Sequence, residues 1–141
     1  MSPQGWGAWG ATFAGLGVVT GAIGAHALKG TFATLGTAEI WDTASTYQLA
    51  HGIALVLTAL AAFLASHLRG VDAASVTVMK GPLVWASRLF LGGIILFSGS
   101  LYLYAVGAGK FWAHVTPFGG FAFILGWFVF AYALLRLRRA A

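Results

Sequence analysis

Four long apolar stretches run through the chain, and the charged residues lie between them. Stretches free of Asp, Glu, Lys and Arg cover residues 6–28, 43–68, 89–109 and 111–135. A helix needs about 20 apolar residues to cross the hydrocarbon of a bilayer, and each stretch is long enough. Helix is the expected conformation there, because every backbone N–H and C=O must find a partner within its own segment. The pattern therefore predicts an all-α fold, an integral membrane four-helix transmembrane bundle.

Capping and turn residues predict where the helices begin. Thr37 followed by Glu39 is typical of an N-cap with an acid in the first turn, so the second helix should begin near Ala38. Gly81-Pro82 predicts the start of the third helix, because proline at the first helical position gives up no hydrogen bond. We place the spans at about residues 6–28, 43–68, 85–106 and 115–135.

The composition excludes a water-soluble globule. Of 141 residues, 60% are hydrophobic and 8% are charged, and the mean hydropathy is +0.87. Soluble domains are nearer 25% charged. The spans leave no room for a soluble domain, so residues 1–141 are expected to form a single four-span domain. There are no cysteines, which excludes disulfides and thiolate chemistry.

The basic residues indicate orientation in the membrane and do not indicate a nucleic-acid partner. The formal net charge is +5, but the charges stand at span ends and not on one soluble face. One end of an even-span bundle holds Arg69, Lys80, Arg88, Arg136, Arg138 and Arg139, and the other holds Lys29 and Lys110. Because basic residues concentrate on the cytoplasmic side, both termini are expected in the cytoplasm.

Small residues predict how the helices pack, since helices in a bilayer associate by close approach and interhelical hydrogen bonds. Two stripes repeat every fourth residue: Ala50, Ala54, Thr58, Ala62 and Ser66 in the second helix, and Gly17, Gly21 and Ala25 in the first, which also has Gly10, Gly15 and Gly24. These stripes predict a tight antiparallel hairpin of the first two helices. A seam between copies of the chain is the alternative interpretation.

Polar side chains from all four helices gather in the half of the predicted bundle away from the termini. The cluster consists of His26, Tyr47, Gln48, His51, Ser98, Tyr102 and His114. An unpartnered imidazole or amide in hydrocarbon costs several kcal/mol, so we expect these groups to hydrogen-bond one another. Trp127 lies in mid-span and also needs a partner for its indole N–H.

Three roles fit such a cluster. Hydrogen bonds between helices hold many bundles together, which favours a structural role. Ionisable residues inside a membrane often mark sites, so a pocket for a small ligand is the second role. Metal binding is least favoured, because no two histidines stand three or four residues apart. Two-histidine haem ligation is disfavoured because the predicted depths of His51 and His114 differ, and no cofactor is expected.

Four ordered motifs carry a resemblance to a known family. They are Gly21-Ala-Ile-Gly-Ala-His-Ala-Leu28, Thr43-Ala-Ser-Thr-Tyr-Gln-Leu-Ala-His51, Phe97-Ser-Gly-Ser-Leu-Tyr102, and Thr116-Pro-Phe-Gly-Gly120 with Gly126-Trp127. Over nearly its whole length the chain resembles the family known as domain of unknown function 423, which is similar to eukaryotic transmembrane protein 256. The resemblance implies a four-helix protein of the bacterial inner (plasma) membrane, without established activity, cofactor or substrate. The family's signature residues coincide with the polar cluster and add Pro117.

These observations predict a non-enzymatic membrane scaffold or accessory subunit. No Ser-His-Asp order, paired-carboxylate motif or phosphate-binding loop is present, so we expect no enzyme. The expected partners are the lipid bilayer and either a second copy of the chain or another membrane protein. The alternative is a membrane module that binds a lipid-like or quinone-like small ligand, or a metal.

Overall fold

A computed structural model describes residues 1–67 and 73–137, and almost all of these residues are helical. In chain order the elements are α1 (Pro3–Ala25), α2 (Lys29–Leu35), α3 (Ala38–His67), α4 (Ala73–Gly93), the π-helix η1 (Ile94–Ser98), α5 (Gly99–Ala105) and α6 (Phe111–Leu137). Four helices are long and apolar enough to cross a membrane: Pro3–Ala25, Ala38–Ser66, Lys80–Ala105 and Phe111–Arg136. The predicted all-α class is confirmed. Arg69, Arg138 and Arg139 lie outside the described residues.

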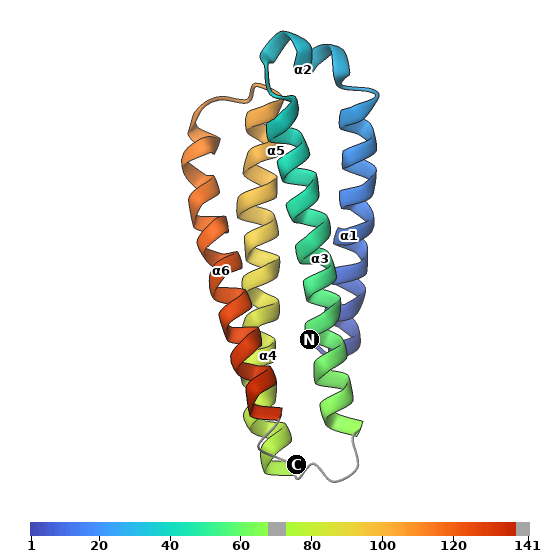
Figure 1. Cartoon of the computed structure of the whole chain (residues 1–141), viewed down its shortest axis with the longest axis vertical. Coiled ribbons are helices and arrows are strands. Elements are labelled where there is room, and N and C mark those ends of the chain that lie inside the picture. Colours follow the sequence, from blue (N-terminus) through green and yellow to red (C-terminus); the bar gives the residue numbers. More distant parts are fainter. Residues whose placement is uncertain (68–72, 138–141) are drawn as a thin grey trace.

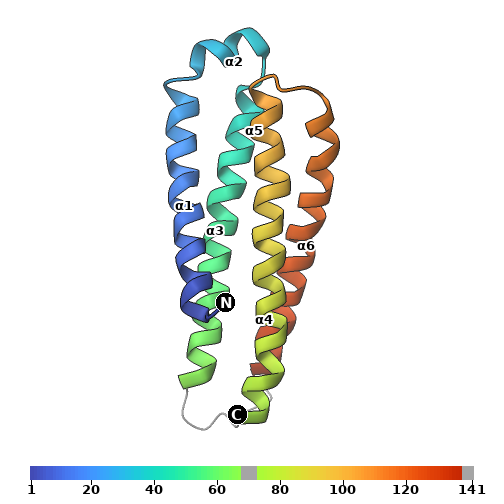
Figure 2. The ribbon, with the colours of Figure 1, turned by 180° about the vertical axis from the view of Figure 1, so that it is seen from behind.

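Four rods stand side by side in chain order, as Figures 1 and 2 show from opposite sides. α1 packs on α3, α3 packs on α4, and α4 packs on α6, while α4, η1 and α5 follow one another in a single rod. The short α2 closes one end of the bundle, together with the α5–α6 connection (Figure 1). The N-terminus and the last turns of α6 lie toward the opposite end.

The contact between α1 and α3 is made by glycines seven residues apart. Gly10, Gly17 and Gly24 are the buried glycines of α1. A Cβ atom on Gly10 would lie 2.8 Å from the Gly52 carbonyl oxygen, and one on Gly17 would lie 2.9 Å from the Leu49 nitrogen. Real Cβ atoms do not approach backbone so closely, so only glycine allows the two helices this separation.

The predicted hairpin therefore forms, but the predicted stripe on α1 is wrong. Of that stripe only Gly17 makes the close approach; Gly21 has room for a Cβ 3.6 Å from Ser45, and Ala25 is exposed. On α3 the predicted stripe is also divided, because Ala54 and Thr58 are buried while Ala50 and Ser66 are exposed. The α1–α3 contact follows a seven-residue period, the spacing at which one face of a helix returns toward its neighbour.

Two helix starts differ from the prediction. α4 begins at Ala73, so Pro82 lies inside a helix and does not open one. α6 begins at Phe111, four residues before the predicted start, and likewise contains Pro117. Prolines are tolerated inside membrane helices because neighbouring helices and local adjustments satisfy the freed backbone groups. The start of α3 at Ala38 agrees with the prediction.

Two elements were not predicted. α2 turns the chain across the end of the bundle: its Phe32 is buried beside the Trp41 ring, at a centroid distance of 5.3 Å, and Gly36 ends it with a φ of 67°. η1 widens one turn of the third rod, where the Gly99 N–H donates to the Ile94 carbonyl, five residues back. Opposite this turn, a Cβ on Gly119 would collide with the backbone of Phe97, so α6 approaches η1 closely.

We expect Gly10→Ala to destabilise the protein by about 1–3 kcal/mol, because the added methyl group meets backbone atoms of α3 that cannot turn aside. Gly15→Ala on the same helix is the matched control. No atom lies within 4 Å of its Cβ position, so it should be neutral or stabilising by about 0.5–1 kcal/mol. Unfolding in mixed detergent micelles measures both changes, and equal stability of the two variants would contradict the close contact.

Candidate functional site

Polar side chains of the spans form separate hydrogen bonds, each joining two helices. The bonds between side chains are Thr20–Tyr102 at 2.7 Å, Thr58–Ser87 at 2.9 Å, Ser100–Thr116 at 2.8 Å and Trp127–His51 at 3.2 Å. Side chains also donate to carbonyl oxygens of other elements: Trp41 to Thr20 at 2.8 Å, Gln48 to Phe13 at 3.0 Å and Thr37 to Ala105 at 2.7 Å. The polar groups are thus spread along the bundle in pairs, and they do not meet in one cluster.

His51, on α3, is buried, and both of its ring nitrogens have partners, so it is the centre of the candidate site. Its Nδ1 lies 2.8 Å from the Tyr47 carbonyl oxygen, and its Nε2 lies 3.2 Å from the indole Nε1 of Trp127. An indole N–H can only donate, so Nε2 is the acceptor and the proton of the neutral ring is on Nδ1. Both ring nitrogens of His51 therefore have hydrogen-bond partners. The partner that the Trp127 indole was expected to need is His51.

Aromatic rings surround the His51 imidazole. It stacks on Phe123 with ring centroids 3.4 Å apart and an angle of 12° between the planes. Tyr47 and Phe90 each lie at a centroid distance of 5.7 Å. Glycines give these rings their space, since a Cβ on Gly126 would lie 2.7 Å from the Phe90 ring. The imidazole is 6% exposed and packed as a core side chain.

Three other residues of the predicted cluster lie inside the bundle, but none of them forms a hydrogen bond with His51. Gln48 is buried and joins α3 to the α1 backbone at Phe13. Tyr102 is half-buried, bonds to Thr20 through its hydroxyl and lies against the Trp41 ring at 4.5 Å. Ser98, in η1, is 1% exposed, and its hydroxyl oxygen has no hydrogen-bond partner.

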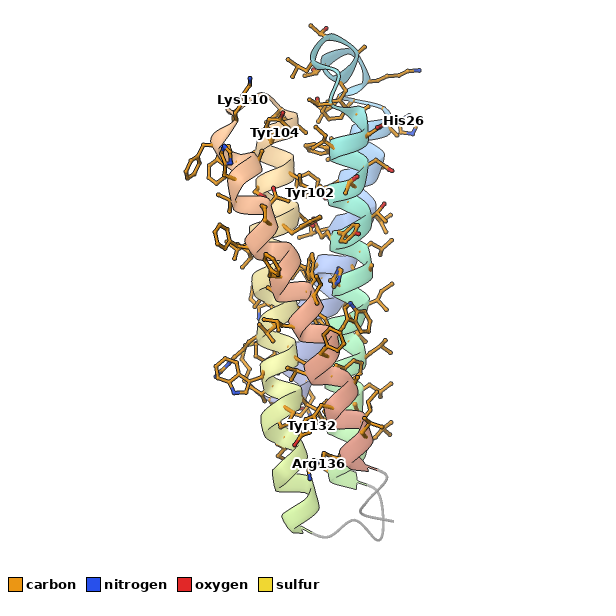
Figure 3. The ribbon with its side chains drawn as sticks, turned by 60° about the vertical axis from the view of Figure 1, so that its left-hand side comes forward. His26, Tyr102, Tyr104, Lys110, Tyr132 and Arg136 are labelled. Atoms are coloured by element: carbon orange, nitrogen blue, oxygen red, sulfur yellow. The ribbon has the colours of Figure 1, made fainter. Side chains whose placement is uncertain are left out.

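The remaining members of the predicted cluster lie at the surface. Tyr47 is 42% exposed, although its ring contacts both His51 and Phe97. His26 and His114 are exposed, and Figure 3 shows His26 toward the end of the bundle that carries Lys110, beyond Tyr102. The prediction that the seven side chains bond to one another is therefore wrong. A helical wheel gives the face of a residue but neither its depth nor the helix opposite it.

Several residues that join helices were missed by the sequence analysis as site residues. Trp41 and Thr20 tie α1 to α3, and Thr58 and Ser87 tie α3 to α4. Serine and threonine carry little sequence signal because they can bond their own backbone, as Ser87 does with the Leu83 carbonyl. Among the described residues, no three His, Cys, Asp or Glu side chains lie close enough to hold a metal ion.

Comparisons with known proteins confirm the family resemblance. A family described as "Protein of unknown function (DUF423)" matches residues 20–120. The UPF0382 membrane protein SERP0230 of Staphylococcus epidermidis is 37% identical over 127 residues, which cover 90% of this chain and 92% of the relative. YwdK of Bacillus subtilis, also a UPF0382 membrane protein, is 35% identical over a match that covers 90% of this chain and 93% of YwdK. The UPF0382 inner membrane protein YgdD of Escherichia coli K12 is 34% identical over a match that covers 86% of this chain and 82% of YgdD. No solved structure matches the chain.

Trp127→Phe is expected to lower the free energy of unfolding by about 0.5–1.5 kcal/mol, because it removes the donor to His51 and keeps an aromatic ring in place. The control is Trp85→Phe, whose side chain is 58% exposed and which should change stability by less than about 0.5 kcal/mol. Denaturation in mixed micelles compares the two. If Trp127→Phe is as stable as the control, the indole–imidazole bond does not hold α3 to α6.

Proposed function

Since the chain belongs to the DUF423 family of membrane proteins, we propose its role from its geometry: a non-enzymatic scaffold or accessory subunit of the bacterial inner membrane. The observation that carries the proposal is the engagement of His51, the one histidine buried among the described side chains. A general base or a metal ligand needs a free ring nitrogen. Here one nitrogen faces the Tyr47 carbonyl and the other accepts from Trp127.

The distribution of the interhelical bonds also supports a structural role. The Thr58–Ser87 bond joins α3 to α4, the Trp127–His51 bond joins α3 to α6, and the bonds of Trp41 and Thr37 lie toward the end closed by α2. Each of them uses a polar group that hydrocarbon cannot satisfy. Buried hydrogen bonds of this kind hold neighbouring helices in one register, which suits a protein whose outer surface meets lipid or another protein.

The outer face of α6 supports contact with lipid and with a membrane partner or a second copy of the chain. Its exposed apolar residues repeat at intervals of three and four: Phe118, Phe121, Leu125, Phe128, Tyr132 and Leu135. This is the spacing at which one helix seats its side chains against another. The two charged ends carry no continuous basic surface along the bundle, so we propose no nucleic-acid partner.

The charges support an orientation with both termini in the cytoplasm. Lys80, Arg88 and Arg136 belong to the half of the bundle near the N-terminus, while Lys29 and Lys110 belong to the opposite end. Basic residues are retained on the cytoplasmic side during insertion. The end closed by α2 would then face outward.

Replacing His51 by Leu is expected to lower the unfolding free energy by about 1–3 kcal/mol, because the Trp127 N–H loses its acceptor. His114→Leu is the matched control, since His114 is exposed, and it should stay within about 0.5 kcal/mol of the wild type. Native mass spectrometry of each purified protein accompanies the unfolding measurement. A His51→Leu protein of normal stability that loses a co-purifying small molecule would show that His51 serves a ligand and would overturn the structural role.

For the orientation, green fluorescent protein fused after residue 141 should fluoresce, and alkaline phosphatase at the same place should be inactive. Alkaline phosphatase fused after Lys110, in the α5–α6 connection, should be active, because that connection lies at the opposite end. The reciprocal pattern in the two fusion series would reverse the orientation.

A further inference from the structure

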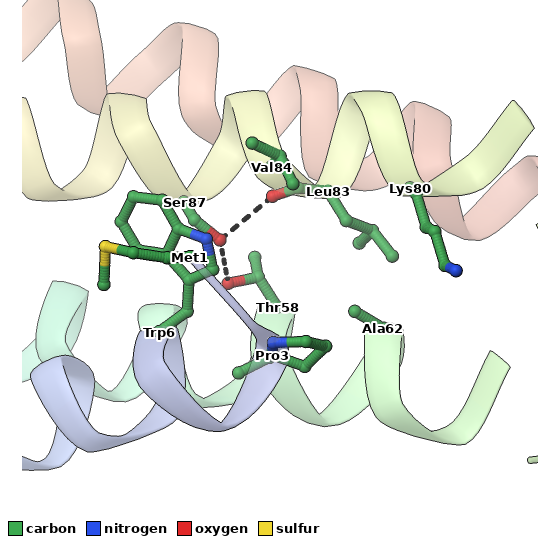
Figure 4. Close-up of a pocket in the computed structure, with 10 residues that line it drawn as sticks. Met1, Pro3, Trp6, Thr58, Ala62, Lys80, Leu83, Val84 and Ser87 are labelled. Carbon is green, nitrogen blue, oxygen red and sulfur yellow. Dashed lines mark hydrogen bonds between the residues drawn. The ribbon is translucent and has the colours of Figure 1, made fainter. Parts of the chain in front are cut away.

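A cavity of about 220 Å³ lies between the start of α1 and the facing turns of α3 and α4 (Figure 4). It is larger than the apolar cavities of about 150 Å³ that take up benzene in other proteins. Most of its lining is apolar, including Ala62 and Leu83. The polar side chains of its wall are Trp6, Thr58, Lys80 and Ser87. His51 does not line the cavity, and the α3 residues in the cavity wall lie in the C-terminal half of that helix.

Trp6 places an unused hydrogen-bond donor in the wall of this cavity. The residue is only 7% exposed, and its indole Nε1 has no hydrogen-bond partner. By contrast, the indole nitrogens of Trp41 and Trp127 donate to the Thr20 carbonyl and to His51. A buried N–H without an acceptor is costly, so a molecule that supplies an acceptor here is favoured over an empty cavity.

The two hydroxyl groups beside Trp6 have no proton left for a ligand. The Ser87 hydroxyl lies 2.9 Å from the Leu83 carbonyl oxygen and 2.9 Å from the Thr58 hydroxyl. The Thr58 hydroxyl in turn lies 2.8 Å from the Leu55 carbonyl oxygen. Each hydroxyl carries one proton, and these contacts use both. Among these side chains, the donors open to a ligand are therefore the Trp6 indole and the Lys80 ammonium.

Lys80 adds a positive charge to the wall of the cavity. Its side chain is exposed, and no carboxylate stands among the residues that line the cavity. Lys80 and Ser87 are seven residues apart on one helix, which is about 10 Å along its axis. The cavity thus offers a charged donor at its rim and a neutral donor deeper in, beside the Thr58–Ser87 pair.

We propose that this cavity binds an anionic glycerophospholipid of the leaflet at the N-terminal end of the bundle. The lipid phosphate lies beside Lys80, an ester carbonyl accepts from Trp6 Nε1, and the adjoining methylene groups contact Ala62 and Leu83. A fatty acid brings a single carboxylate, whereas a glycerophospholipid brings a separate phosphate and ester carbonyl for the two donors. An ammonium-bearing headgroup meets the charge of Lys80 unfavourably, which gives the site its preference for an anionic lipid.

The test measures binding of phosphatidylglycerol to the full-length protein in a zwitterionic detergent. Native mass spectrometry counts the lipids bound, and the shift in melting temperature on lipid addition reports specific binding. Trp6→Phe keeps the ring but removes the N–H, and should weaken phosphatidylglycerol binding about two- to tenfold. Trp9→Phe, three residues along the same helix and 49% exposed, is its matched control and should bind like the wild type.

Lys80→Gln, with Arg88→Gln as its control, tests the role of the charge, and Ala62→Phe tests the role of the cavity volume. Lys80→Gln should abolish the preference for phosphatidylglycerol over phosphatidylcholine. Arg88→Gln on the same helix should retain it, because the Arg88 guanidinium lies over the Trp85 ring, at 5.1 Å, and does not line the cavity. Ala62→Phe fills the cavity without changing either donor, and should remove the lipid-induced rise in melting temperature while the lipid-free protein stays folded.

Equal binding by Trp6→Phe and Trp9→Phe would overturn the proposal, as would equal binding of the two phospholipids by the wild type. Tighter binding of oleate or of a short-chain quinone than of phosphatidylglycerol would also overturn it. These outcomes do not depend on the structural role proposed for His51, because that role is measured by the stability of His51→Leu without added lipid.

Discussion

Hydrocarbon offers no hydrogen bonds, so every polar group carried into the spans depends on another part of the same protein. This constraint explains why the polar side chains occur in pairs across helix contacts. Trp127 bonds to His51, Gln48 to a backbone carbonyl of α1, and Thr58 to Ser87. The Ser98 hydroxyl and the Trp6 indole nitrogen depart from the rule, and the Trp6 nitrogen lies in the wall of a cavity. An unsatisfied donor beside a cavity therefore indicates a ligand site, whereas a histidine with both nitrogens bonded in a packed core indicates a structural role.

Glycine determines which pairs can form. Backbone atoms of α1 and α3 approach each other at Gly10 and Gly17, and this brings the α1 carbonyl of Phe13 within reach of Gln48. On the other side of the bundle, Gly126 leaves room for the Phe90 ring that borders His51. Close packing and hydrogen bonding are thus coupled, since a polar side chain of fixed length can only reach a helix that comes near enough.

Features whose cause lies within a few neighbouring residues are predictable from the sequence. The length of the apolar stretches predicts four spanning helices, and Thr37 with Glu39 predicts the start of α3. Pro82 did not mark a helix start, because it lies within α4, where neighbouring helices compensate for the missing bond. The need of Trp127 for a partner was predictable, but the identity of that partner was not.

The class of the protein follows from its amino-acid sequence, because hydropathy and span length depend on local composition and four motifs indicate the family. Which polar groups meet depends on how the helices pack. The tertiary structure separated His26 and His114 from His51, paired His51 with Trp127, and left a cavity beside Trp6. The physical reason is that a hydrogen bond requires two atoms within about 3 Å, and such a distance between helices depends on their separation, rotation and depth together. No single helix carries that information.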